Sequence, residues 1–327
     1  MERVPNPIVG PNKFKLGLFN ANCDGGFTLS KAPERWRCEW DEVVNACVMA
    51  DEAGIDFILP VAKWRGLAGE ADNLGRSFET MTHSAAIGAM TKRIGLFATV
   101  HVPLATPAFV AKSIATIDHV TYGRAGLNIV CGWNQDEFNV HGVTIDPERR
   151  YDQGLEWFRV YAKLLEGGPP FDWDGEFYRL RGLTTNPLTV QRPRPPIMSA
   201  GFSPKGRAFA AQAADLLFTS VSNMQRAPTI VKSVHDFAAH YGRKVAVFTT
   251  CHIVCRPTRK EAEEFYYYYA EEMIEMSGAG LAGASICFLD YLAAMPYFIQ
   301  EVLPRLESAG LRHPSPVGGG WPRKAVG

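Results

Sequence analysis

The sequence lacks the marks of several common protein classes. Its seven cysteines are an odd number without a CxxC pair, which argues against a disulfide framework and against a structural zinc site. No stretch approaches 18 uninterrupted apolar residues, and Met1–Lys15 lacks the apolar run of a signal peptide. We therefore expect a protein of the reducing cytoplasm that does not enter a membrane.

An excess of charge of one sign is missing as well. Lysine and arginine together number 34, aspartate and glutamate also number 34, and the basic residues are scattered along the chain. Proteins that bind nucleic acid or an anionic membrane gather basic residues in a patch, so we expect neither partner. No HExxH motif occurs, and His101, His119 and His141 lack the spacing of metal ligands, so no metal site is expected.

What the chain does contain is an alternation of short apolar runs with amphipathic stretches of helical length. Eight such units can be counted in the 327 residues. The predicted strands are Phe14–Asn20, Asp56–Val61, Ile94–Thr99, Ala125–Val130, Ile197–Gly201, Leu216–Thr219, Val245–Val254 and Ala284–Leu289. The predicted helices are Asp41–Ala53, Ser77–Met90, Pro107–Val120, Arg150–Leu165, Lys205–Ala214, Pro228–Tyr241, Arg259–Met276 and Tyr291–Leu306.

Strands that alternate with helices pair in parallel, and eight such units close into a barrel. We predict an α/β fold, a (β/α)8 TIM barrel that forms a single domain over residues 1–313, with a coil tail over 314–327. Insertions are expected after the fourth strand, at 131–149, and before the fifth, at 167–195, where Phe171–Tyr178 suggests a small hairpin. An open doubly wound sheet is the alternative, but Ala21–Gly26 does not fit its GxGxxG motif.

In such a barrel the working residues lie at the carboxyl ends of the strands and just beyond them. Polar and aromatic side chains follow the first five predicted strands there. These positions are Asn20 and Asn22, Ala62–Arg65, Thr99 and His101, Asn128 with Gly132–Glu137, and Ser199–Ser203. Such groups can orient a flat heterocycle, which needs apolar faces and hydrogen bonds in its plane.

Several segments, in the same order, resemble one family. Gly123–Trp133 (GRAGLNIVCGW) is similar to a GR-x-x-x-N-x-V-x-G-W motif, and Ala115–Asp118, Arg150–Asp152 and Ala200–Ser203 also agree. Together with 172–178 and 187–196, they resemble the bacterial luciferase-like flavin-dependent monooxygenases, nearest to the pyrimidine, alkanesulfonate and dimethylsulfone monooxygenases. The resemblance extends from about Lys15 to Glu272.

The resemblance implies a two-component monooxygenase. FMN, reduced by a separate NAD(P)H-dependent flavin reductase, would react with O2 and oxidise a small organic substrate through a flavin peroxide. The substrate would be a heterocyclic amide, a sulfonate or a sulfone, and a homodimer or homotetramer is expected. The alternatives are a deazaflavin-dependent dehydrogenase, a flavin-binding relative without catalysis and, less favoured, a cofactor-free hydrolase.

The resemblance also assigns roles to individual residues. The positions implied to bind the cofactor are Ala62, Lys63, Asn128, Glu137, Arg150, Tyr151 and Ser203. Thr99 and Asn128 correspond to the place where oxygen meets the reduced ring, and His101 lies beside them as a third catalytic candidate, although it could also be a packing histidine. Ser203 precedes Pro204 as a helix N-cap, where free backbone N–H groups favour a phosphate.

Some of these positions have an ordinary structural alternative. Lys63 could belong to a solvated rim. Arg150 could begin a helix and pair with Asp146 or Glu148, and Trp133 could be a core residue.

One segment departs from the family pattern. Glu272–Met276 leads almost directly into Ser277–Gly283, where family members generally carry a longer stretch. We expect the mobile loop and the helix that would shield the site from water to be absent or much reduced.

Overall fold

Eight parallel strands form the centre of the molecule. The computed structural model describes residues 5–27, 35–67, 72–221, 223–253, 255, 258, 260–261, 283–288 and 291–314. The strands close into a barrel in the order β1-β10-β9-β8-β7-β4-β3-β2. Their bounds are β1 Lys15–Phe19, β2 Phe57–Leu59, β3 Gly95–His101, β4 Ala125–Val130, β7 Ile197–Ala200, β8 Leu216–Phe218, β9 Ala246–His252 and β10 Gly283–Cys287. The prediction of a (β/α)8 barrel is confirmed.

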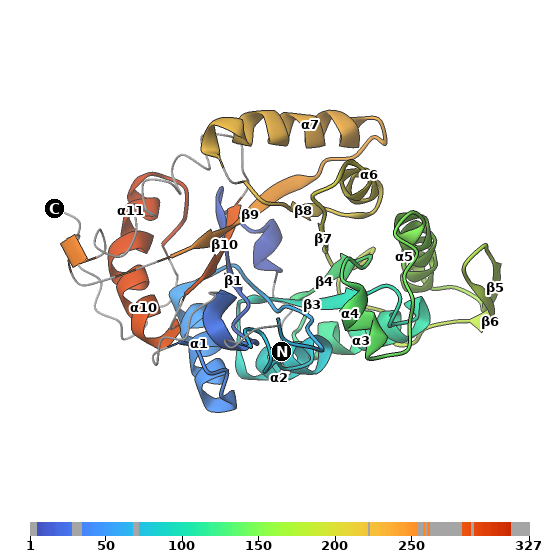
Figure 1. Cartoon of the computed structure of the whole chain (residues 1–327), viewed down its shortest axis with the longest axis horizontal. Helices are drawn as coiled ribbons and strands as arrows, with labels where there is room; N and C mark the ends of the chain where they lie inside the picture. Colours follow the sequence, from blue (N-terminus) through green and yellow to red (C-terminus); the bar gives the residue numbers. More distant parts are fainter. Residues whose placement is uncertain are drawn as a thin grey trace.

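Helices surround the barrel, as Figure 1 shows. Their bounds are α1 Trp40–Ala53, α2 Thr80–Met90, α3 Pro107–Val120, α5 Arg150–Glu166, α6 Pro204–Ala213, α7 Ala227–Ala239, α10 Tyr291–Tyr297 and α11 Leu303–Ser308. A π-helical turn, Phe298–Val302, separates α10 from α11 within the single helix predicted there. Most of the predicted helix Arg259–Met276, the short segment before β10 and the predicted tail beyond residue 314 lie outside the described residues.

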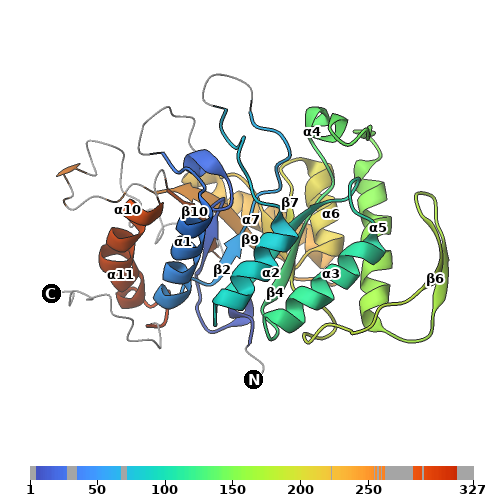
Figure 2. The same cartoon turned by 90° about the horizontal axis from the view of Figure 1, so that it is seen from below.

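Two additional pieces extend the barrel. The short helix α4 (Gln135–Asn139) lies between β4 and α5, and an antiparallel hairpin of β5 (Phe171–Asp174) and β6 (Arg179–Leu183) lies between α5 and β7. The hairpin projects away from the barrel in Figures 1 and 2. Glu156 of α5 anchors its turn, because the carboxylate accepts hydrogen bonds of 3.0 Å from the backbone nitrogens of Glu176, Phe177 and Tyr178.

Aromatic rings fill the barrel interior at the level below the carboxyl ends of the strands. The ring of Phe57 meets those of Phe97 and Phe248, with centroids 5.6 and 5.7 Å apart. Glycines make room for them, since a Cβ atom at Gly17 would lie 2.2 Å from the Phe57 ring and one at Gly126 would lie 2.6 Å from the Phe97 ring. The interior is therefore filled at this level, and the cavity that could hold a ligand lies nearer the carboxyl ends of the strands.

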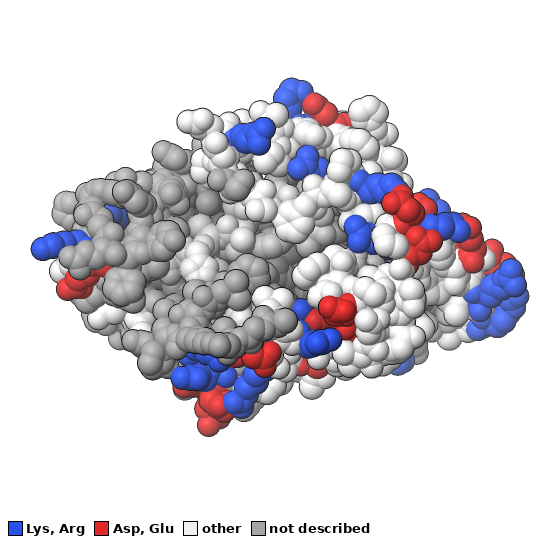
Figure 3. All heavy atoms as spheres, in the orientation of Figure 1, with Lys and Arg blue, Asp and Glu red and all other residues white. Residues whose placement is uncertain are grey.

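Figure 2 shows α4 at one end of the barrel. On the face shown in Figure 3, acidic and basic side chains lie interspersed around the periphery. Among the helices that the structure describes, none combines the length and the apolar character that crossing a bilayer requires.

Candidate functional site

A cavity of about 520 Å³ opens at the carboxyl ends of β2, β3, β4 and β7. Its volume lies within the range of about 300–1,000 Å³ that is usual for cofactor pockets, and its wall is mainly apolar. Eight of the nine predicted site residues line it, namely Ala62, Lys63, Thr99, His101, Asn128, Arg150, Tyr151 and Ser203. The sequence therefore located the pocket, although the roles of these residues stay predictions.

Two polar side chains project from neighbouring strands into this cavity. The register of β3 and β4 pairs Thr99 with Asn128. The Thr99 hydroxyl donates to the carbonyl oxygen of Pro60 over 2.5 Å, and Asn128 Nδ2 donates to Thr99 Oγ1 over 3.1 Å. The other atom of the Asn128 amide, Oδ1, is buried without a partner among the described residues. A buried polar atom without a partner is costly, which points to a ligand that supplies one.

Strand β3 was predicted to end at Thr99, but it extends two residues further. Thr99 and His101 therefore both lie on the strand, and His101 is its last residue. Burial lowers the pKa of His101 to about 4, and the ring is uncharged at neutral pH. Its edge packs against Phe138 with ring centroids 5.4 Å apart, and Nδ1 has no partner among the described residues. A neutral imidazole of this kind can exchange hydrogen bonds with a ligand without bringing charge into the cavity.

Lys63 and Glu137 form a buried ion pair beside the cavity. Each side chain is 4% exposed, so the alternative of a solvated rim for Lys63 is wrong. Glu137 Oε2 also accepts a 3.0 Å hydrogen bond from the backbone nitrogen of Trp64. Glu137, predicted to contact the cofactor, is the one predicted residue that does not line the cavity; it holds Lys63 and the loop after β2 in place.

The guanidinium of Arg150 lies at the start of α5. Its Nη1 donates to the carbonyl of Gly132 over 2.9 Å, and its Nε is buried without a partner among the described residues. Its Cζ atom lies 5.0 Å from the centre of the Tyr151 ring. Arg150 does begin α5, but among the described residues it forms no ion pair with Asp146 or Glu148, and the Glu148 carboxylate pairs with Lys205 at 2.5 Å.

The amino terminus of α6 faces the same region. Ser203 caps this helix, as predicted, by accepting a 3.1 Å hydrogen bond from the nitrogen of Gly206, and Pro204 follows it. A Cβ atom at Gly206 would lie 2.8 Å from the Tyr151 hydroxyl, so that hydroxyl approaches the first turn of the helix. Free N–H groups and the helix dipole favour an anion here, with Arg150 lining the same cavity.

Aromatic side chains frame the mouth of the cavity. Trp133 and Phe202 line it while remaining 66% and 57% exposed, so the core alternative for Trp133 is wrong. Cys131 also lines the cavity, and burial raises the pKa of its thiol, which argues against a nucleophile. No group of three His, Cys, Asp or Glu residues in the described part of the chain could hold a metal ion.

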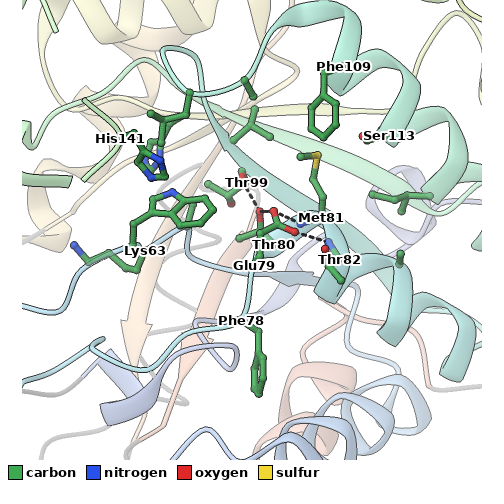
Figure 4. Close-up of a pocket in the computed structure, with 18 of the residues that line it drawn as sticks. Lys63, Phe78, Glu79, Thr80, Met81, Thr82, Thr99, Phe109, Ser113 and His141 are labelled. Carbon is green, nitrogen blue, oxygen red and sulfur yellow. Dashed lines mark hydrogen bonds between the residues drawn. The ribbon is translucent and has the colours of Figure 1, made fainter. Parts of the chain in front are cut away.

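A second hollow, of about 680 Å³, lies between α2 and α3 on the other side of β3 (Figure 4). The Thr80 hydroxyl donates to the carbonyl of Thr99 over 2.5 Å, and the Glu79 carboxylate caps α2 by accepting from the nitrogens of Met81 and Thr82. This hollow is larger, but it contains only four of the predicted site residues: Ala62, Lys63, Thr99 and His101. Those four also line the first cavity and so form the wall between the two.

Comparisons with known proteins agree on one family. Residues 14–299 match the family model of luciferase-like monooxygenases. The pyrimidine monooxygenase RutA of Methylorubrum extorquens (strain PA1) is 30% identical over 279 residues, which cover 83% of this chain and 74% of that protein. An FMNH2-dependent dimethylsulfone monooxygenase of Pseudomonas putida is 29% identical over 249 residues, which cover 76% of this chain and 67% of that protein.

The fold is also shared with solved structures. A riboflavin lyase, crystallised with modified FMN and riboflavin, matches with a TM-score of 0.84 at 19% identity over 93% of each chain. At that identity the likeness concerns the fold alone.

The contribution of the Lys63–Glu137 ion pair to stability can be tested by mutation. Glu137→Gln should lower the free energy of unfolding by about 3–5 kcal/mol, because it leaves a buried ammonium without a counter-charge. Urea unfolding followed by tryptophan fluorescence measures the loss. The double variant Glu137→Gln with Lys63→Met should recover most of it, since no buried charge remains. An equal loss in the single and double variants would show that the loss does not come from an unpaired ammonium.

Proposed function

The chain belongs to the luciferase-like monooxygenase family, and we propose that it oxidises a small organic substrate with O2 and with FMN that a separate NAD(P)H-dependent reductase has reduced. The observation that carries the proposal is the shape of the cavity. The apolar chamber contains unpaired polar atoms, and the amino terminus of helix α6 lies at its edge. A flat ring with a phosphate tail requires such an arrangement.

The residues present fit such a cofactor. Three lining residues carry buried atoms that need a partner, Oδ1 of Asn128, Nδ1 of His101 and Nε of Arg150. At the phosphate end, Arg150, Tyr151 and the α6 terminus at Ser203 supply a cation, a hydroxyl and backbone N–H groups. We propose that these three hold the phosphate and that Ala62, Lys63 and Asn128 border the ring.

Bound reduced flavin supplies the electrons that activate O2, and the protein supplies position and environment. The relevant contributions of this chain are orientation and the exclusion of water. Thr99 fixes the amide of Asn128 towards the ring, while Phe19, Leu59 and Phe218 give the chamber an apolar wall. Because His101 stays uncharged, it can hold a hydrogen-bonding group without attracting water as a cation would.

The charges around the cavity favour an uncharged substrate. Among the described lining residues, the cations are Lys63 and Arg150. Lys63 is neutralised by Glu137, and the proposal assigns Arg150 to the phosphate. An anionic sulfonate would then lack a counter-charge in a desolvated chamber. We therefore favour a heterocyclic amide or a sulfone over a sulfonate, in keeping with the pyrimidine and dimethylsulfone monooxygenases among the relatives.

We also propose that the protein is a homodimer or homotetramer in the cytoplasm. Three large apolar side chains of α2 and α3, Met90, Phe109 and Val120, are 50%, 57% and 36% exposed, and Phe109 also lines the hollow between these helices. A second copy of the chain would cover them. All seven cysteines are buried thiols outside any disulfide, which suits a reducing compartment, and recovery of the chain in a periplasmic fraction would contradict that location.

The assigned activity can be tested by titrating the protein with FMN, reducing it without oxygen, and adding an O2 pulse with a candidate substrate. We expect oxygen uptake with product formation for uracil or dimethyl sulfone and little for an alkanesulfonate. Flavin binding without substrate-dependent product would indicate a binding protein. Reduction of a deazaflavin by the substrate would indicate a dehydrogenase. Absence of flavin binding would exclude the proposal.

Comparing the dissociation constants of FMN and riboflavin distinguishes the phosphate site from the ring site. Arg150→Gln should raise the dissociation constant of FMN by about tenfold or more, because a charge-assisted hydrogen bond is worth about 1.5–3 kcal/mol. The dissociation constant of riboflavin, which lacks the phosphate, should hardly change. Arg149→Gln is the matched control, since Arg149 is its exposed neighbour and pairs with Glu176. An equal loss of affinity for FMN and for riboflavin would show that Arg150 does not bind the phosphate.

The subunit contact can be tested by light scattering. The unmodified chain should have the mass of a dimer or tetramer at micromolar concentration, and Phe109→Glu should shift it towards the monomer by placing a charge in an apolar contact. Phe237→Glu, at another exposed apolar side chain on α7, is the control and should leave the mass unchanged. A monomeric unmodified chain would contradict the proposed assembly.

A further inference from the structure

Glu156, in the second turn of α5, is a buried carboxylate that does not line the cofactor cavity. The residue is 8% exposed, and its carboxylate accepts hydrogen bonds from four N–H groups. Three bonds of 3.0 Å come from the backbone nitrogens of Glu176, Phe177 and Tyr178, and one of 3.1 Å comes from Trp173 Nε1. All four donors belong to the hairpin of β5 and β6, so this side chain ties the hairpin to α5.

The contact between this carboxylate and the hairpin is close and electrostatically favourable. A Cβ atom at Gly175 would lie 1.8 Å from Glu156 Oε1, so only a glycine lets the turn approach this far. Burial alone would raise the pKa of Glu156, but the N–H donors outweigh it and hold the pKa below its ordinary value. The carboxylate is therefore ionised at neutral pH, and hydrogen bonds from the hairpin stabilise its charge.

The hairpin lies against one face of the first two turns of α5 (Figure 2). Gln153, three residues before Glu156 and therefore on the same face, donates to the Tyr178 hydroxyl over 3.3 Å. A further contact, the ion pair of Arg149 with Glu176, is 44% and 61% exposed, and exposed pairs of this kind stabilise little. The buried carboxylate of Glu156 is thus the main attachment of the hairpin to this helix face.

The other face of the same two turns borders the cofactor cavity. Arg150 and Tyr151 line the cavity, and Gly154 packs on Cys131 so closely that a Cβ atom there would lie 2.5 Å from the sulfur. The N-cap residue of α5, Arg149, forms no side-chain capping bond among the described residues. Because a first turn without a cap frays easily, the hairpin is well placed to hold the turn that carries both cavity residues.

We propose that Glu156 is a positioning residue for the phosphate site, and that it orients Arg150 and Tyr151 by holding the hairpin against α5. The inference rests on the proposed function, since it takes the phosphate of FMN as the ligand at this end of the cavity. Glu156 does not line the cavity, so its effect passes through the first turn of the helix. A guanidinium that is already oriented loses less conformational freedom when an anion binds, and the affinity for that anion is higher.

The test is Glu156→Gln, which keeps the size of the side chain but turns one acceptor oxygen into an NH2 group facing buried N–H donors. Dissociation constants are measured for FMN and for riboflavin. The value for FMN should rise about threefold to tenfold, and the value for riboflavin should hardly change, since only FMN carries the phosphate. Glu166→Gln, at the exposed last residue of α5, is the matched control and should change neither value.

A double-mutant cycle with Arg150 distinguishes positioning from a general loss of stability. In the Arg150→Gln background, Glu156→Gln should weaken FMN binding much less than it does in the unmodified protein, because the main group that it orients is already absent. Fully additive effects of the two substitutions would overturn the proposal. An equal loss of affinity for FMN and riboflavin in Glu156→Gln, or no loss for FMN, would overturn it as well.

Gly175→Ala provides a second variant that does not depend on the folding of Glu156→Gln. The added methyl group would push the turn away from the carboxylate while the carboxylate itself stays in place. It should reproduce the selective loss for FMN, and unchanged affinity for FMN would overturn the positioning role. If the unmodified protein bound neither flavin, the proposed function itself would be rejected, whereas FMN binding that ignores Glu156 and Gly175 would reject the positioning role alone.

Discussion

Parallel closure of the barrel is the constraint from which the site follows. Eight strands that all run in one direction have their carboxyl ends on one rim, so β2, β3, β4 and β7 deliver their terminal residues to the same place. Below that rim, Phe57, Phe97 and Phe248 fill the interior against Gly17 and Gly126. A ligand can enter only where the rings end, and the side chains at that level, beginning with Thr99 and Asn128, decide what it meets.

The same rim concentrates polar groups in an apolar setting, which is unfavourable for the empty protein. The Lys63 and Glu137 side chains are desolvated together, and Asn128, His101 and Arg150 each keep one buried atom without a partner among the described residues. Packed strands and capped helices hold these groups in place before any ligand arrives. Such preorganisation is the usual way in which a protein stabilises a charge or a hydrogen bond that forms only in the complex.

The bounds of many elements were predictable because local rules determine them. Helix α3 begins at Pro107 behind the cap of Thr106, and β4 spans the apolar run Ala125–Val130, both as predicted. The predicted helix Tyr291–Leu306 is helical throughout, but a π-helical turn that the sequence did not predict lies within it, between Pro296 and Pro304, which cannot donate backbone hydrogen bonds.

Contacts between distant residues were beyond such rules. Lys63 and Glu137 are 74 positions apart and meet only because α4 folds over the loop after β2, and no periodicity in the sequence encodes that. The pairing of Thr99 with Asn128 likewise needs the register of two strands. For this reason the sequence could place both residues at the rim without revealing that the hydroxyl of one orients the amide of the other.

The wall between the two hollows links the proposed assembly to the proposed chemistry. Ala62, Lys63, Thr99 and His101 face the cofactor cavity on one side and the hollow between α2 and α3 on the other. A second copy seated on α2 and α3 would close that outer side, so the wall would separate the cofactor from protein and not from water. Dissociation would then hydrate His101 and Thr99 from behind, and water near a reactive cofactor diverts it from the substrate. Subunit association would then help to retain the oxidising equivalent by keeping water away from these four residues.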